Sequence, residues 1–380
     1  MKQAILHVGF HKTASTSIQE TLSQNRRVLR NAGWSYAKFT RFGRDASNHS
    51  VPLITLFDEN SGKLGINLSA GDALEAEYRR YSAELDQNLR SDLPLILSGE
   101  GASTLNKKGL YRLRQRFADR GWQLRVIAFI RAPTPLLHST AAQIVKGGSA
   151  GVLQKAPLAN RLSRRIDAVR AVFPDAEFYP FEGTKGHEHG PVGFFLELID
   201  PALPRHVRIR RENERISENA VALLRHLNTA IPFHIHTPKR RVNPLRMLND
   251  SLPLHGLSGR RFYLSSADLE TVSEEIAEQN AWLAENLGPQ FCDTETTVLD
   301  GPVQWTDAHA AELRACLRWM PAHLRTAVAS YFDDRPDLPD ALKGFGARYG
   351  IGHHRLMRFL REAPGIGRLE TIYRTLRRQW

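Results

Sequence analysis

Four short apolar runs rich in β-branched and aromatic residues punctuate the 380-residue chain. They are AILHVG at 4–9, LPLILS at 93–98, LRVIAFI at 124–130 and AEFYPF at 176–181, and each is typical of a β-strand. Between them lie segments with apolar residues at helical spacing, such as Ile18, Leu22 and Leu29. Near-continuous apolar strands that alternate with helices indicate an α/β fold, with a parallel sheet flanked by helices on both faces.

The remaining pattern is largely helical. The stretch from Trp34 to Arg90 holds one apolar run, VPLITLF at 51–57, and a helix-like segment at 70–89. Together they predict a long crossover connection between two strands. Two further helices are predicted at 217–228 and 265–287, because Ser217 and Ser265 are suitable N-caps for the periodic segments that follow them.

The C-terminal part differs from the rest in its pattern. Residues 293–302 are rich in Thr and Asp, lack periodicity and end in Gly-Pro, which predicts a linker. Residues 303–380 show short helical patterns interrupted by prolines and no strand signal. The sequence therefore predicts an α/β domain over 1–292 and an all-helical C-terminal extension, or appendage, over 303–380.

Composition narrows the class of protein. Hydrophobic residues make up 42% and charged residues 24% of the chain, as in ordinary soluble globular proteins. The first residues do not resemble a signal peptide and no apolar stretch is long enough to span a membrane, so a cytoplasmic protein is expected. Cys292 and Cys316 have no metal-ligand spacing, which argues against a zinc site or a disulfide scaffold.

The charge of the chain points to an anionic partner. Lys and Arg exceed Asp and Glu, which gives a formal net charge of +12. Such a surface attracts a nucleotide, an acidic glycan, nucleic acid or a lipid surface, and it also serves solubility. Charge alone does not choose among these partners.

A candidate anion site follows the first strand. The sequence HVGFHKTASTSIQ predicts a short loop that leads into a helix at Ser17 or Ile18. Unsatisfied backbone N–H groups at a helix N-terminus attract anions, and Lys12 adds a full positive charge beside them. Ser15 and Thr16 supply hydroxyl donors. The alternative is an ordinary βα turn in which Thr13 or Ser15 only caps the helix.

This loop is not a Walker A motif, since the second glycine before the lysine is missing. It resembles the 5′-phosphosulfate loop of sulfotransferases that use 3′-phosphoadenosine 5′-phosphosulfate (PAPS), whose pattern is K-[TS]-G-[TS]-[TS]; Ala14 replaces the glycine. The resemblance implies a P-loop sulfotransferase of the bacterial carbohydrate type, with PAPS as the co-substrate and no metal. The donor-binding residues that it implies in this loop are Gly9, His11, Lys12, Thr13, Ala14, Ser15 and Thr16.

A second element carries the same resemblance. Arg131 follows the strand at 124–130, and Ser139 lies eight residues further on in a helix predicted to begin near Pro135. In the family this spacing marks the 3′-phosphate site, where an arginine fork and a hydroxyl clamp one phosphate. Weaker similarities, Phe181-Glu182-Gly183 to the family's Y-E-D segment and 213–217 to its N-x-S segment, extend the resemblance over about residues 3–290.

The resemblance also suggests the catalytic residues. In the family the general base is a His or Glu near the end of the strand at 93–98, where this chain has Glu100. His49 is the second candidate for the base. The expected mechanism is in-line sulfuryl transfer in which the base activates an acceptor hydroxyl and Lys12 neutralises charge on the leaving phosphate. Glu100 capping a turn or pairing with a buried Arg is the alternative.

The chain departs from the better-known family pattern at two further positions. Ser98 stands where cytosolic members have a lysine, and Ser17 where they have an aromatic residue. Lys107 and Lys108 are the candidates to replace the missing lysine.

Two other functions remain open. A P-loop nucleotide or small-molecule kinase shares the strand, loop and helix but needs a Mg²⁺-binding carboxylate. A non-catalytic binder of nucleic acid or anionic surfaces is also consistent with the Arg-rich segment 351–380, whose apolar positions fit one helix face. That helix face either packs on its own domain or gives the sulfotransferase a peripheral membrane contact. The expected acceptor, by family analogy, is a glycan or glycolipid, with no nucleic-acid partner.

Overall fold

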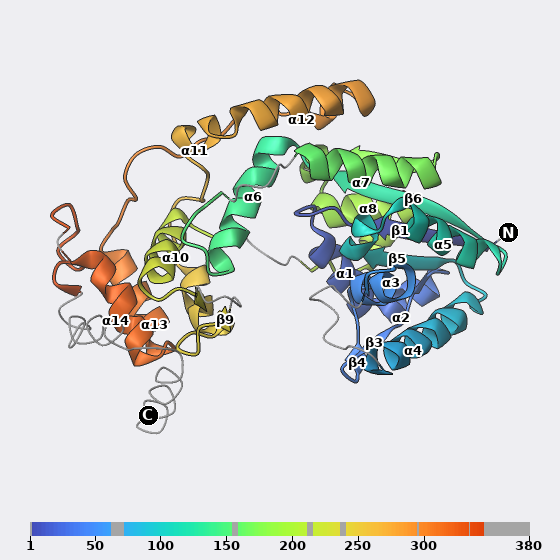
Figure 1. Cartoon of the computed structure of the whole chain (residues 1–380), viewed down its shortest axis with the longest axis horizontal. Coiled ribbons are helices and arrows are strands. Elements are labelled where there is room, and N and C mark those ends of the chain that lie inside the picture. The colour runs from blue at the N-terminus through green and yellow to red at the C-terminus, as the bar shows by residue number, and fades with distance from the viewer. Residues whose placement is uncertain are drawn as a thin grey trace. The chain divides into compact units, whose positions relative to one another are not determined.

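The computed structural model of the chain describes residues 2–61, 72–153, 159–210, 216–235, 241–294, 296–333 and 335–345. Its centre is a five-stranded sheet in the order β2-β5-β1-β6-β7, in which all neighbouring strands run parallel (Figure 1). The strands are β1 Lys2–Val8, β2 Ser35–Tyr36, β5 Leu95–Gly99, β6 Trp122–Ile130 and β7 Glu177–Pro180. The predicted parallel sheet is confirmed, and the short edge strand β2 is an addition that two residues are too few to signal.

Side chains of the sheet alternate between its two faces, as strand geometry requires. Leu6 and Val8 of β1 belong to a core that includes side chains of α3, α4, α5 and α7, whereas Ile5 belongs to a second core with α1, α2 and α8. Both faces of the sheet are therefore covered, which explains why the central positions of its strands are mostly apolar.

The helices that accompany this sheet include the predicted ones with shifted ends, and α7, α8 and α9, which the sequence did not predict. They are α1 Ser15–Gln24, α2 Arg26–Asn31, α3 Ser50–Phe57, α4 Asp72–Leu89, α5 Lys107–Ala118, α7 Ala159–Val172, α8 Gly190–Ile199, α9 Leu203–His206 and α12 Ser273–Asn286. The apolar run at 51–57 forms α3, and the small antiparallel pair β3 Thr40–Arg41 and β4 Arg44–Asp45 precedes it.

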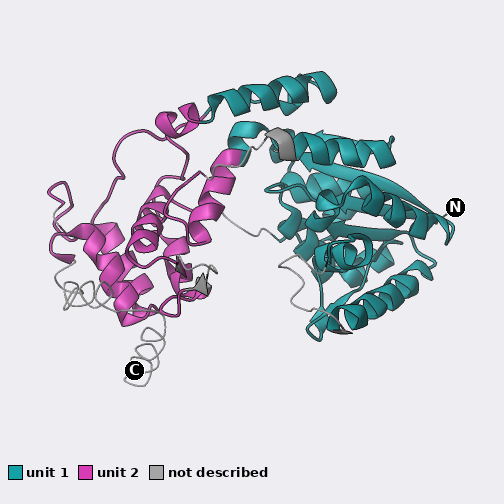
Figure 2. Ribbon diagram, in the orientation of Figure 1, with its two compact units in different colours: residues 1–136, 157–214, 272–296 teal, residues 137–156, 215–271, 297–380 magenta. Residues whose placement is uncertain are grey.

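The structure divides into two compact units (Figure 2). Unit 1 comprises Met1–Leu136, Pro157–Glu214 and Val272–Thr296 and contains the sheet. Unit 2 comprises Leu137–Ala156, Arg215–Thr271 and Thr297–Trp380. The helix α6 Pro133–Lys146 begins in unit 1 and continues into unit 2.

Unit 2 is mainly helical within its described residues. Its elements are α10 Glu218–Ala230, α11 Ser266–Glu270, α13 Ala308–Arg318, α14 Ala322–Ala329 and the two-stranded pair β8 His234–Ile235 and β9 Arg241–Val242. The predicted caps Ser217 and Ser265 are confirmed, because each hydroxyl accepts a backbone N–H of the first helical turn. The single helix predicted at 265–287 is instead the two helices α11 and α12.

The predicted separate appendage is not confirmed. His226 of α10 is hydrogen-bonded to Ser330 just after α14 over 2.9 Å, and the side chain of Asn219 donates to the carbonyl of Gln304. Residues after 302 thus pack with helices from the middle of the chain, and the boundaries 1–292 and 303–380 do not match the two units. Strand and helix periodicity detects elements but does not show which helices share a core.

The predicted linker is held by side-chain hydrogen bonds at both ends. Asp293 accepts the backbone N–H of Thr134 at 3.0 Å and its hydroxyl at 2.8 Å, and so caps the start of α6. Asp300 accepts the backbone N–H and hydroxyl of Ser266 at the start of α11. The Thr- and Asp-rich composition of 293–302 therefore supplies helix caps. The segment 351–380, whose apolar positions fit one helix face, lies outside the described residues.

Among the helices that the structure describes, none is both long enough and apolar enough to cross a membrane.

Candidate functional site

The loop after β1 contains two residues in the left-handed region. Helix α1 begins at Ser15, earlier than the sequence predicts, and its N-cap is Ala14. Ala14 lies in the left-handed region with φ of 59°, as does Lys12 with φ of 64°. No side chain caps the α1 N-terminus at Ala14, so the simple capping alternative for Thr13 or Ser15 finds no support here.

The conformation of Ala14 is one that favours glycine. A left-handed backbone costs an L-residue roughly 1–2 kcal/mol, whereas glycine adopts it freely. Position 14 is the one place where this loop departs from K-[TS]-G-[TS]-[TS], and it is a place where the backbone favours glycine. The chain keeps the turn and accepts the strain of an alanine.

Glu100 lies against this loop. Residues Val8 and Gly99 are paired in the parallel register of β1 and β5, and the Gly9 amide donates to the Gly99 carbonyl over 3.3 Å. A Cβ atom on Gly9 would lie 2.7 Å from Oγ of Ser15 and 2.9 Å from Cγ of Glu100. The absence of a side chain at position 9 is therefore what lets the Glu100 side chain and the α1 N-terminus approach each other.

The electrostatics of Glu100 suit a general base. Burial raises the pKa of the Glu100 carboxyl above its ordinary value, while the Lys12 ammonium acts in the opposite direction. A carboxylate with a raised pKa is a stronger base than an exposed one, and it lies near the Lys12 ammonium and Oγ of Ser15 in the loop after β1. The structure thus brings together Gly9, Lys12, Ser15 and Glu100 from the predicted site.

The other loop residues have separate roles. Thr13 is fully buried and its hydroxyl donates to the Phe10 carbonyl over 2.7 Å, which holds the loop closed on itself. His11 and Thr16 are exposed at the surface of the loop. Thr16 lies in the first turn of α1, where its hydroxyl is accessible to an anion.

Arg131 is hydrogen-bonded to the backbone of the loop after β1. Its side chain is only 5% exposed, and Nη1 donates to the Lys12 carbonyl over 2.9 Å. Nε lies 3.4 Å from the Glu182 carboxylate, and the guanidinium lies 5.1 Å from the centre of the Phe181 ring. The same carboxylate accepts the Ala132 amide over 3.2 Å. The segment Phe181-Glu182-Gly183, predicted on resemblance alone, is thus a neighbour of Arg131.

Ser139 belongs to unit 2, in the part of α6 that follows Leu136, and is half-buried. Arg131 belongs to unit 1. The phosphate clamp by Arg131 and Ser139 stays a prediction.

His49 is not retained as a candidate base. It is fully buried, stacks on Tyr36 at 4.6 Å between ring centres and accepts the Ser98 amide at Nδ1 over 3.2 Å. Burial lowers the pKa of His49 to about 3, with a smaller contribution from the charge of Arg26. A base needs contact with the acceptor, which a fully buried ring does not have.

The suggested replacements for the missing lysine do not gain support. Lys108 forms an ion pair with Glu59 over 2.5 Å, and Lys107 is exposed at the first residue of α5. Ser98, which stands in the lysine's place, is fully buried and shares a 2.8 Å hydrogen bond with His7. Sequence reasoning missed this buried His7–Ser98–His49 arrangement, whose signal is polar residues inside otherwise apolar strands.

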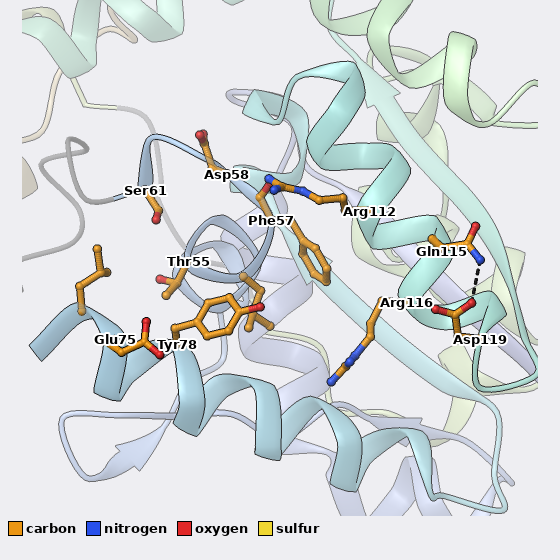
Figure 3. Close-up of a pocket in the computed structure, with 12 residues that line it drawn as sticks. Thr55, Phe57, Asp58, Ser61, Glu75, Tyr78, Arg112, Gln115, Arg116 and Asp119 are labelled. Atoms are coloured by element: carbon orange, nitrogen blue, oxygen red, sulfur yellow. Dashed lines mark hydrogen bonds between the residues drawn. The ribbon is translucent and has the colours of Figure 1, made fainter. Parts of the chain in front are cut away.

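A pocket of about 550 Å³ lies elsewhere in unit 1, where the end of α3 meets α4 and α5 (Figure 3). It is lined by Arg112, Arg116 and Tyr78 among others, and it includes neither Lys12 nor Glu100. Arg112 lies 3.6 Å from Glu59, which Lys108 also pairs with, and Arg116 lies 2.9 Å from Asp86, which Arg120 also pairs with. This pocket is not the predicted site.

Comparison with known proteins finds no matching family model, no similar curated protein and no similar solved structure. Across the ranges that the structure describes, no group of three or more His, Cys, Asp or Glu side chains is arranged to hold a metal ion.

Proposed function

We propose that the chain is a PAPS-dependent sulfotransferase whose donor site is the loop 9–16 and whose general base is Glu100. The observation that carries the proposal is the convergence of Lys12, Ser15 and Glu100 at the carboxyl ends of β1 and β5. The proposed fold family is the P-loop type.

The sheet topology supports this location. From β1 the chain leads to β2 and β5 on one side and then to β6 and β7 on the other, so the strand order reverses at β1. Ligands of open α/β sheets bind outside the carboxyl ends of strands at such a switch point. The loop after β1, Glu100 after β5 and Arg131 after β6 all lie at this edge.

Each residue then has a defined task in the transfer. Glu100 accepts the proton of the acceptor hydroxyl as that oxygen forms a bond to sulfur. The bond between sulfur and the 5′-phosphate oxygen breaks, and adenosine 3′,5′-bisphosphate leaves with the bonding electrons. Lys12 and the amides at the start of α1 stabilise the charge that grows on this leaving group. Arg131 holds the Lys12 backbone in place through its hydrogen bond.

The acceptor that we propose is a glycan or glycolipid hydroxyl, on the analogy of the bacterial carbohydrate enzymes that the loops resemble.

The first test is calorimetric titration with adenosine 3′,5′-bisphosphate in the absence of magnesium. We expect micromolar binding that weakens about 10- to 100-fold in Lys12→Ala, because a charge-assisted hydrogen bond contributes about 1.5–3 kcal/mol. The matched control is Lys38→Ala, which removes an exposed lysine paired with Asp45 at the surface. Binding of ATP with magnesium, and none of the bisphosphate, would instead support a kinase.

The second test measures transfer from PAPS to a panel of sugar acceptors. Loss of one preorganised donor typically costs about 10²–10³ in rate, so Lys12→Ala should be nearly inactive while it remains folded. Glu100→Gln keeps the size of the side chain and removes the base. Unchanged transfer in Glu100→Gln would exclude Glu100 from the mechanism.

A further inference from the structure

Glu100 lies in a short turn, Gly99-Glu100-Gly101, that connects β5 to a single 3-10 turn over Glu100–Thr104. On its β5 side this turn is bound to α3 by two hydrogen bonds. The amide of His49 donates to the Ser98 carbonyl over 3.0 Å, and the Ser98 amide donates to Nδ1 of His49 over 3.2 Å. His49 therefore fixes the residue at which β5 ends.

Ser50 binds the other side of the same turn. The Gly101 amide donates to Oγ of Ser50 over 2.8 Å. The hydroxyl of Ser50 in turn donates to Oδ1 of Asn48 over 2.6 Å, and this oxygen also accepts the Ser50 amide. Since its proton is directed at Asn48, the Ser50 oxygen presents a lone pair to Gly101.

The backbone of the turn is also packed tightly on α3. A Cβ atom on Gly99 would lie 3.0 Å from the Ser50 amide nitrogen, and one on Gly101 would lie 2.6 Å from Cδ1 of Ile54. The turn has no room to move toward α3. Two glycines flank Glu100 because α3 lies directly against their backbone.

We infer that His49 and Ser50 are positioning residues that hold the turn of Glu100 so that its carboxylate points at the phosphate loop. This inference rests on the proposed function. Neither residue contacts the reacting atoms; the two act through the backbone on either side of the base. The arrangement also explains a histidine near the site that is too buried to be a base itself.

Among the described residues, the charged group that acts on the pKa of Glu100 is Lys12, from the loop after β1. His49 on the α3 side is neutral, because burial lowers its pKa to about 3. Loosening the turn exposes the carboxylate to water, and the pKa of Glu100, raised by burial, should then move down toward its ordinary value.

The test uses Ser50→Ala in the full chain. We expect transfer with a kcat lowered about tenfold, an unchanged KM for PAPS, and an acid limb of the pH profile that moves to lower pH. Ser50→Thr, which keeps the hydroxyl, should restore the wild-type profile. The control is Asn106→Ala, which removes a similar cap from α5, where Oδ1 accepts the Gly109 amide over 2.8 Å.

A second measurement does not depend on activity. Titration of ¹³C-labelled glutamate carboxyls by NMR, with the Glu100 signal assigned from Glu100→Gln, reports the pKa of Glu100 directly. A lower pKa in Ser50→Ala than in wild type supports the positioning role even if PAPS proves not to be the donor. An unchanged pKa, or the same change in Asn106→Ala, overturns it.

Discussion

The left-handed Ala14 offers a test of the loop geometry by a single substitution. Ala14→Gly relieves a backbone cost of roughly 1–2 kcal/mol. The greater freedom of glycine in the unfolded chain lowers the free energy of unfolding by about 0.4–1 kcal/mol. Loss of the Ala14 methyl group lowers it by about 0.4 kcal/mol more, which is half the value for a fully buried methyl group, because Ala14 is only partly buried. We expect a net stabilisation of about 0.5 kcal/mol.

The assay must report on unit 1 alone, because two units give no single unfolding free energy for the chain. Urea dependence of hydrogen exchange at the β1 amides satisfies this condition. Gly33→Ala provides the reference, since Gly33 has φ of 83° and a Cβ atom there would meet no atom within 4 Å. It should destabilise unit 1 by about 1 kcal/mol.

The refuting result is Ala14→Gly destabilising unit 1 while Gly33→Ala shows the expected cost. The loop would then not hold position 14 in the left-handed region, and the structural explanation for the family's glycine would fail. If the substitution stabilises the protein, affinity for adenosine 3′,5′-bisphosphate should stay the same or rise.

Three further predictions concern residues around the sheet. Burial lowers the pKa of both His7 and His49 to about 3, so the folded state binds fewer protons than the unfolded state below pH 6.5 and stability falls from there toward pH 3. At pH 5 each histidine should cost unit 1 about 2 kcal/mol relative to pH 7, and a flat pH profile of the free energy from hydrogen exchange at the β1 amides would contradict this. Glu182→Gln removes the charge opposite a buried guanidinium and should destabilise unit 1 by about 1.5–3 kcal/mol, against at most about 1 kcal/mol for the exposed partner Lys185→Ala. Asp293→Ala removes the cap of α6 and should cost about 1–2 kcal/mol by the same exchange measurement, with no change expected if the cap does not form.

The sheet was predictable because its signal is local. Each of the four predicted strands is an apolar run set off by polar or turn residues, and a parallel sheet buried on both faces requires such runs. The domain boundaries were not predictable in the same way. Which helices share a core depends on contacts such as His226 with Ser330, which lie far apart in the sequence and carry no periodicity.

The candidate site also contains features that the sequence suggested and features that it did not. Lys12 was predicted from the loop before a helix N-terminus and Glu100 from the family resemblance, and the pairing of Val8 with Gly99 brings these two loops together. The environment of His49 could not be read from its neighbours in sequence, since Tyr36 buries it through a short edge strand that the pattern does not show. Sequence motifs and strand order therefore suggest which residues meet at the sheet edge. Their proposed roles, Glu100 as the base and His49 as a buried positioning residue, depend on burial, which only the packed fold determines.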